Sequence, residues 1–170
     1  MTISMYQASV PRLINGLINL SHLLDKAQTH AEAKKIDPTV FASMRLYPDM
    51  FPLSRQVQIA CDVCKGLVAR LAGVEIPAHE DTEKDLKDLQ ARIAKTIAFL
   101  ESFKPEQIDG TEDKDIVIKR GEKETHYKGM QFLLGHGLPN LYFHTTTTYS
   151  MLRASGVEIG KSDYLSLIHI

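Results

Sequence analysis

Side chains that bind metals or carry protons stand close to the apolar seam in the last long helical segment of the sequence. His144 and Asn140 are four positions apart, and at about 100° per residue both lie on one flank of that seam. An imidazole in this position can ligate a metal or act as a general acid or base. A structural histidine with satisfied hydrogen bonds is the alternative, and the residue pattern leaves both interpretations open.

Two glutamines, Gln56 and Gln58, lie beside the apolar face of an earlier helical segment. Gln56 borders that face and Gln58 lies further round the helix, and a solvated helix surface would explain both. The sequence contains no H-E-x-x-H pair, no G-x-S-x-G turn and no glycine-rich phosphate loop. Any chemistry must therefore come from polar groups that project inward from facing helices.

Cys61 and Cys64 form a C-x-x-C pair. In a thiol oxidoreductase such a pair opens a helix after a strand, where the helix dipole lowers a thiol pKa. Here the pair stands inside a helical pattern with no strand before it. We interpret both cysteines as small buried side chains, and redox activity is the alternative.

The elements that must position these residues are four segments with helical periodicity. In the first, leucines recur at spacings of four and three from Leu13 to Leu24, which is typical of a helix packed nearly parallel to its neighbours. The segments are expected to run from about Met5 into the thirties, from Pro52 to Gly73, from the acidic cluster HEDTEKD to Lys104-Pro105, and from Met130 to Ser155.

Several residues predict where these segments begin, bend or end. Asp81 or Thr82 is expected to cap the third segment, and Gly156 to stop the fourth. Pro139 should bend the fourth segment or split off its first turns. Alternating β-branched residues on both sides of Arg120-Gly121-Glu122 predict a small hairpin.

Together these elements predict an all-α fold. We expect an up-up-down-down four-helix bundle, an order that fits the longer connections, with a small β-hairpin between helices three and four. The length of 170 residues fits a single domain spanning 1–170.

The composition excludes several classes of protein. Apolar residues make up 44% and charged residues 24%, which excludes a disordered chain and a disulfide-stapled miniprotein. A formal net charge of −1 without long runs of one sign gives no expectation of nucleic-acid binding. No apolar stretch is long enough to span a membrane, and the N-terminus lacks a signal-peptide pattern, so a cytoplasmic location is expected.

The stretch PNLYFHTTTTYSMLRASGVEIGKSDYL resembles the C-terminal helix of the DinB/YfiT-like superfamily, bacterial four-helix bundles described as metalloenzymes. The chain from MYQASVPRL through MFPLSRQVQIACD to its end also resembles an uncharacterised bacterial family of about this length. The closer resemblance covers nearly the whole chain. The wider one rests on helix order, the histidine of the last helix and a Leu-Arg-x-x-Gly-Val ending at Val157.

The resemblance implies a divalent metal, nickel or zinc, held by one histidine on the second helix and two on the fourth. Alignment on the Leu152-Arg153 ending places His144 at the second helix-four ligand and Asn140 at the first. The helix-two position falls near Gln56 or Gln58, and we take Gln58 as the candidate. Amides bind divalent transition metals far less well than imidazole, so this set predicts a degenerate metal site.

Two functions follow from the resemblance. The first is a non-catalytic bundle that binds a small-molecule ligand in a polar pocket around His144, Asn140 and a helix-two glutamine. The second is a thiol transferase or isomerase of the DinB/YfiT type, with His144 as the catalytic group, with or without metal. Related bundles commonly pair through helix faces, so a homodimer is expected.

Overall fold

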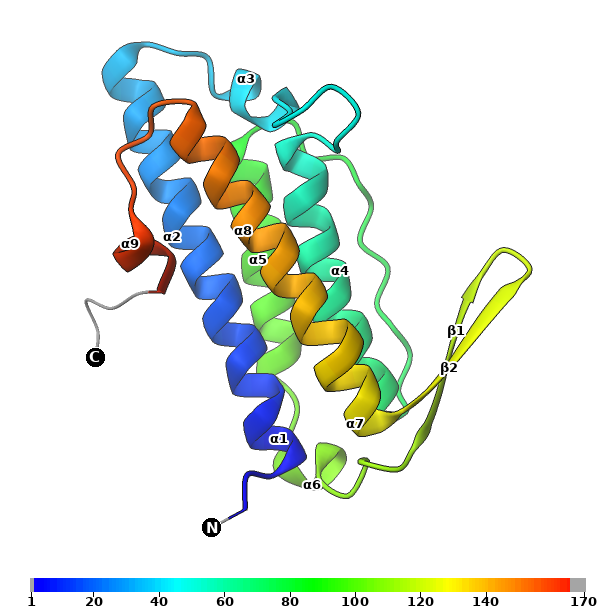
Figure 1. The fold of residues 1–170 in the computed structure, drawn as a ribbon. Coiled ribbons are helices and arrows are strands. Elements are labelled where there is room, and N and C mark those ends of the chain that lie inside the picture. Colours follow the sequence, from blue (N-terminus) through cyan, green and yellow to red (C-terminus); the bar gives the residue numbers. More distant parts are fainter. Residues whose placement is uncertain (1, 166–170) are drawn as a thin grey trace.

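Four long helices carry the apolar seams of the sequence and pack side by side (Figure 1). They are α2 (Val10–Lys34), α4 (Leu53–Ala72), α5 (Leu86–Glu101) and α8 (Leu138–Ala154). The structure is a computed structural model that describes residues 2–165 apart from the side chain of Arg120, so residues 1 and 166–170 of the expected domain lie outside the described residues. The predicted all-α class is confirmed.

The helices run in an order that differs from the expected up-up-down-down. Figure 1 shows α2 and α8 running in one direction and α4 and α5 in the other, which gives up-down-down-up along the chain. The connection that contains α3 (Pro38–Ser43) stays at one end of the bundle, where the amide of Leu53 donates to the carbonyl of Met44 at 2.9 Å. The segment between α4 and α5 instead runs back along the bundle, so these two helices are parallel.

The ends of the helices follow from local residues in most cases. Helix α4 begins directly after Pro52 and ends at Gly73, which adopts a left-handed conformation with φ of 75°. Helix α5 begins at Leu86 rather than near Asp81, because Asp85 is its cap and accepts from the amide of Asp88. The first predicted helix is interrupted at Ser9, which separates the short α1 (Met5–Ala8) from α2.

A buried arginine ties the α4–α5 connection to the bundle. The side chain of Arg92 on α5 is 2% exposed and pairs with Asp62 of α4 at 2.9 Å, with Asp81 at 3.1 Å and with Glu83 at 2.8 Å. Asp81 also pairs with Arg55. This network occupies the Asp81 carboxylate, which explains why it does not cap α5.

The predicted hairpin lies between α5 and α8. Strand β1 (Asp115–Arg120) pairs antiparallel with β2 (Lys123–Lys128), with Asp115 opposite Lys128. Gly121 in the turn has φ of 60°, a conformation that glycine adopts without strain. The short helices α6 (Pro105–Ile108), before the hairpin, and α9 (Lys161–Leu165), after α8, were not expected.

A wide turn separates the hairpin from α8. The chain passes from α7 (Gly129–Phe132) through the π-helical segment η1 (Leu133–Gly137) into α8. Pro139 stands in the first turn of α8 and has no amide hydrogen, so it cannot complete the helical bonding of the turn before it. The amide of Leu138 bonds to Leu133, five residues back, as a π turn requires.

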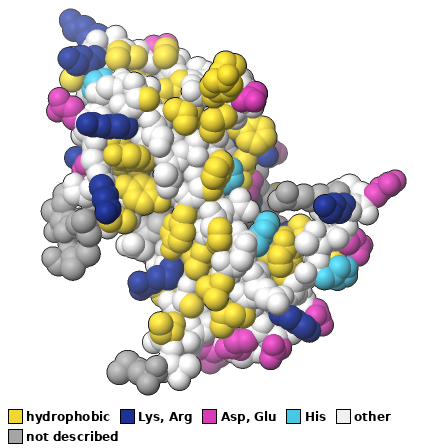
Figure 2. All heavy atoms as spheres, in the orientation of Figure 1, with side chains coloured by type: hydrophobic (Ala, Val, Ile, Leu, Met, Phe, Trp, Pro, Cys, Tyr) yellow, Lys and Arg dark blue, Asp and Glu magenta, His cyan; other side chains and the backbone are white. Residues whose placement is uncertain are grey.

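The core is one cluster of buried apolar side chains contributed by all four long helices. Apolar side chains also gather on the outer face of α8 (Figure 2), where Tyr142 and Phe143 are exposed. Within residues 2–165, no helix has the length and apolar character needed to cross a bilayer.

Candidate functional site

His144 lies between α4 and α8, with 7% of its surface exposed. Its Nδ1 is 2.7 Å from Oε1 of Gln56 on α4. An amide oxygen only accepts hydrogen bonds, so Nδ1 carries the proton and donates it. The amide nitrogen of Gln56 donates in turn to the carbonyl of Phe51 at 3.2 Å. Helix α4 therefore holds the imidazole in one tautomer.

The surroundings of His144 favour its neutral form. Burial lowers the pKa of His144 from its ordinary value of 6.5, and the positive charge of Arg55 lowers this pKa further. The other ring nitrogen, Nε2, makes no hydrogen bond to any residue between 2 and 165. His144 is thus a neutral imidazole with one nitrogen committed to Gln56.

The two glutamines of α4 face different neighbours, as expected for positions 200° apart on a helix at about 100° per residue. Gln56 faces α8, whereas Gln58 donates to Glu83 at 2.8 Å and accepts from Arg55 at 3.3 Å. Gln58 is buried, but against the α4–α5 connection rather than against His144. It was the sequence candidate for the helix-two position, while Gln56 makes the contact to α8.

Asn140 lies one turn before His144 on α8 and is half-buried. Its amide nitrogen is 3.4 Å from Nε2 of His136. No hydrogen bond joins any two of the three predicted ligands His144, Asn140 and Gln58. The structure brings His144 together with Gln56, and Asn140 together with His136.

The residues around His144 do not fit the divalent metal that the DinB-like resemblance implies. Zinc and nickel sites need several imidazole, thiolate or carboxylate donors, and among the described residues the hydrogen-bond partner of the His144 ring is an amide, Gln56. The oxygen of Gln56 already accepts from His144, so it is not available as a ligand. Among the described residues, no three His, Cys, Asp or Glu side chains come together in a way that could hold a metal ion.

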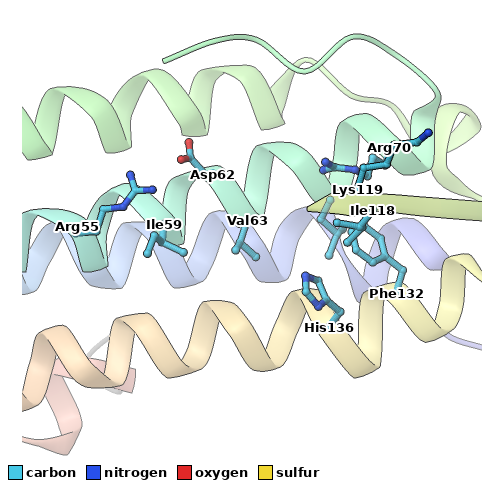
Figure 3. Close-up of a pocket in the computed structure, with 11 residues that line it drawn as sticks. Arg55, Ile59, Asp62, Val63, Arg70, Ile118, Lys119, Phe132 and His136 are labelled. Atoms are coloured by element: carbon cyan, nitrogen blue, oxygen red, sulfur yellow. The ribbon is translucent and has the colours of Figure 1, made fainter. Parts of the chain in front are cut away.

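A cleft with a volume of about 390 Å³ opens between α4, η1 and the hairpin (Figure 3). We call it the α4–η1 cleft. Its volume lies in the range of small-molecule sites. Its apolar lining is Ile59, Val63, Leu67, Ile118 and Phe132, and its polar lining is Arg55, Asp62, Arg70, Lys119 and His136, with Gly137 between them.

His136 enters this cleft from the helix opposite α4 (Figure 3). Its ring stacks on Phe132 with centroids 5.3 Å apart and an interplanar angle of 14°, and it lies 5.6 Å from the ring of Tyr127. A regular helix continued back from His144 would point His136 nearly opposite to the seam. The π turn before Pro139 changes that phase, so this histidine faces α4.

Cys61 and Cys64 are both free and buried. Burial raises the pKa of the Cys61 thiol to about 12, and it raises the pKa of Cys64 well above the ordinary value. A thiol of this kind is protonated at neutral pH and is a poor nucleophile. The two side chains therefore match the interpretation of small core residues.

Comparison with known proteins agrees with the DinB-like resemblance. The sequence matches the family described as a domain of unknown function, DUF1993, over residues 5–165. No curated protein matches it. The fold is similar to the crystal structure of a DinB family member protein from Shewanella denitrificans, with a TM-score of 0.85 and 42% sequence identity over 94% of this chain and 90% of that one.

Proposed function

The chain belongs to the DUF1993 family, and from that premise we propose that it is a non-catalytic bundle that binds a small organic molecule in the α4–η1 cleft. The observation that carries the proposal is the lining of this cleft. Apolar side chains from α4, β1 and α7 form its walls, and a few polar groups converge on them. This combination is typical of sites for small organic ligands.

The proposal moves the ligand site away from His144. The predicted pocket centred on His144, Asn140 and a helix-two glutamine, but His144 and both glutamines are absent from the lining of the cleft. Asn140 contributes indirectly, because it contacts His136, which does line the cleft. His144 and Gln56 then serve to join α4 to α8 beside the cleft.

A second large cavity is less suited to a small organic ligand than the α4–η1 cleft. A cavity of about 540 Å³ lies beside the α4–α5 connection, but its lining is mostly charged. Two of those charged groups, Arg92 and Glu83, already pair with each other at 2.8 Å. Five large apolar side chains line the α4–η1 cleft, whereas the apolar side chains of this second cavity are two alanines. Large apolar side chains are typical of the walls of sites for small organic molecules.

The test is amide-resolved NMR of the full chain with a library of small organic fragments. We expect fragment-induced shifts along α4 from Ile59 to Arg70 and in η1. Val63→Phe should remove these shifts, because Val63 is a half-buried residue of the lining and a larger ring would fill the cleft. Val74→Phe is the matched control, because Val74 is exposed at the end of α4.

His144→Gln separates the proposal from the alternative of a His144-dependent transferase or isomerase. Under the proposal this variant binds the same fragments as the wild type. Loss of binding in a folded His144→Gln protein, or shifts that Val63→Phe leaves in place, would contradict the proposal.

A further inference from the structure

We propose that the ligand of the α4–η1 cleft is a small organic anion with an apolar body, and that the guanidinium of Arg70 binds its anionic group. This inference rests on the proposed function and names the chemical class of the ligand. It begins from the cations that line the cleft, Arg55, Arg70 and Lys119, and from what each of them already contacts.

Two of these cations have carboxylate partners within the protein. Arg55 pairs with Asp81, and Lys119 pairs with Glu124 at 2.6 Å. Arg70 has none among the described residues, and its one hydrogen bond runs from Nη1 to the carbonyl oxygen of Gly66 at 2.8 Å. A guanidinium has five N–H donors, so most of the donors of Arg70 remain available to a ligand.

The end of α4 does not require Arg70. A basic residue in the last turn of a helix often serves the free carbonyls there. In α4 the carbonyls of Ala69 and Arg70 accept from the backbone of Gly73, and the carbonyl of Leu71 accepts from Nζ of Lys114 at 2.7 Å. The side chain of Arg70 instead turns back along the helix to Gly66, into the cleft.

Gly66 makes room for this arrangement. A Cβ atom at position 66 would lie 2.6 Å from Nη1 of Arg70, well inside van der Waals contact. Glycine in the middle of a helix lowers stability relative to alanine. A glycine at position 66 is therefore explained if it serves to let the guanidinium of Arg70 lie in the cleft.

The charge of Arg70 is partly withdrawn from water. Burial lowers the pKa of Arg70 from its ordinary value, although an arginine stays charged at any physiological pH. A half-buried cation without an acidic partner is unfavourable. An anionic group on a ligand would provide that partner, through two parallel hydrogen bonds if it is a carboxylate or phosphate.

The one acidic residue of the lining is occupied elsewhere. Asp62 pairs with Lys65 at 3.0 Å and with Arg92 at 2.9 Å. Figure 3 shows its carboxylate directed away from Ile59 and Val63. The apolar body of the ligand is expected against those two side chains, with its anionic group toward Arg70.

The test compares hydrocinnamate with hydrocinnamamide, two compounds of nearly equal size that differ in charge, in NMR titrations of the full chain. We expect the acid to bind at least about tenfold more tightly than the amide, because hydrogen bonds to charged groups are stronger than neutral ones. Arg70→Gln should abolish this preference and leave amide binding unchanged. Arg153→Gln, which removes a cation from an exposed position on α8, is the control and should change neither.

Gly66→Ala provides a second test in which Arg70 itself is kept. The added Cβ displaces the guanidinium, so acid binding should weaken while the helix keeps its stability. Equal binding of acid and amide in the wild type, or a preference that survives Arg70→Gln, would overturn the anion assignment and leave the ligand-binding function standing. If neither compound shifts the cleft resonances at millimolar concentration while uncharged fragments of the library do, the anion assignment fails and the ligand-binding function stands. If no fragment of the library shifts them, the function fails as well.

Discussion

His144 and Gln56 depend on each other for a polar partner in the interface of α4 and α8. Both are nearly excluded from water, and a buried donor without an acceptor is costly. The sequence identified His144 as the histidine placed to reach the interior, and its burial agrees with this. Helical phase placed Gln56 nearer the apolar face, but the alignment could not decide between Gln56 and Gln58. The partner of His144 depends on how α4 is rotated against α8 and against the α4–α5 connection.

Gln56→Leu tests this dependence. The change leaves Nδ1–H of His144 without an acceptor, so we expect the free energy of unfolding to fall by about 1–3 kcal/mol. Urea denaturation measures it. The double variant Gln56→Leu/His144→Phe, which removes both polar groups, should recover part of the loss. Strictly additive effects of the two changes would contradict the pairing.

The lowered pKa of His144 predicts a dependence of stability on pH. In the unfolded chain His144 titrates near 6.5, and in the fold its pKa is lower. Below pH 6.5 the unfolded chain therefore binds the proton more readily than the fold does, and stability is lost on acidification. The stabilising contribution of His144 is complete above pH 6.5 and disappears as the pH falls through the lower, folded pKa.

His144→Gln isolates this effect, because all other titrating groups are common to both proteins. Thermal unfolding of wild type and variant should be compared from pH 7.5 down to acidic pH. We expect the stability of the wild type relative to the variant to shrink as the pH falls. A difference that is constant across this range would contradict a lowered pKa.

At the scale of the elements, prolines, glycines and capping residues predicted the helix ends well where their side chains have no partner elsewhere in the described part of the fold. Pro52 and Gly73 bound α4 closely, and the hairpin lies where Gly121 indicated it. The cap of α5 was predicted wrongly because Asp81 is drawn into ion pairs with Arg55 and Arg92. The orientation of His136 could not be predicted from helical periodicity, because the π turn before Pro139 changes the helical phase at this residue.

The π turn also brings η1 close to α4, and Gly137 permits this approach. A Cβ at Gly137 would lie 1.8 Å from Cδ1 of Leu67, which is buried and has little freedom to move. We expect Gly137→Ala to lower the free energy of unfolding by about 1–3 kcal/mol through overpacking. Gly135→Ala is the control, since a Cβ at Gly135 would meet nothing within 4 Å. Equal effects of the two substitutions in denaturant titrations would contradict the close approach.

At the scale of the whole molecule, the four-helix class and the hairpin could be predicted from periodicity and turn residues, but the direction of the helices could not. The relative direction of two consecutive helices depends on whether the connection between them runs the length of the bundle. The lengths of the connections did not show which of them does. The α4–α5 connection runs the length of the bundle, and Arg92 holds its residues Asp81 and Glu83 against α5. The α4–η1 cleft could not be predicted either, because its lining combines residues of α4, the hairpin and η1, whose packing against one another is not encoded in the periodicity of any one segment.

The expected homodimer stays a prediction, and the outer face of α8 is where we expect the contact. Tyr142 and Phe143 are 47% and 58% exposed there, and Figure 2 shows apolar side chains gathered over α8. Light scattering after gel filtration should give twice the mass of one chain, and Phe143→Glu should return the monomer. A wild-type monomer at high concentration would contradict the expectation.

His144 donates to Gln56 where the resemblance implies a metal, and we propose that ligand binding takes place without metal. Elemental analysis tests it most directly, on full-length protein without a histidine tag that is offered nickel, zinc and manganese before gel filtration. We predict far less than one equivalent of retained metal, equal in wild type and His144→Ala. Close to one equivalent in the wild type, lost in His144→Ala, would contradict a metal-free site.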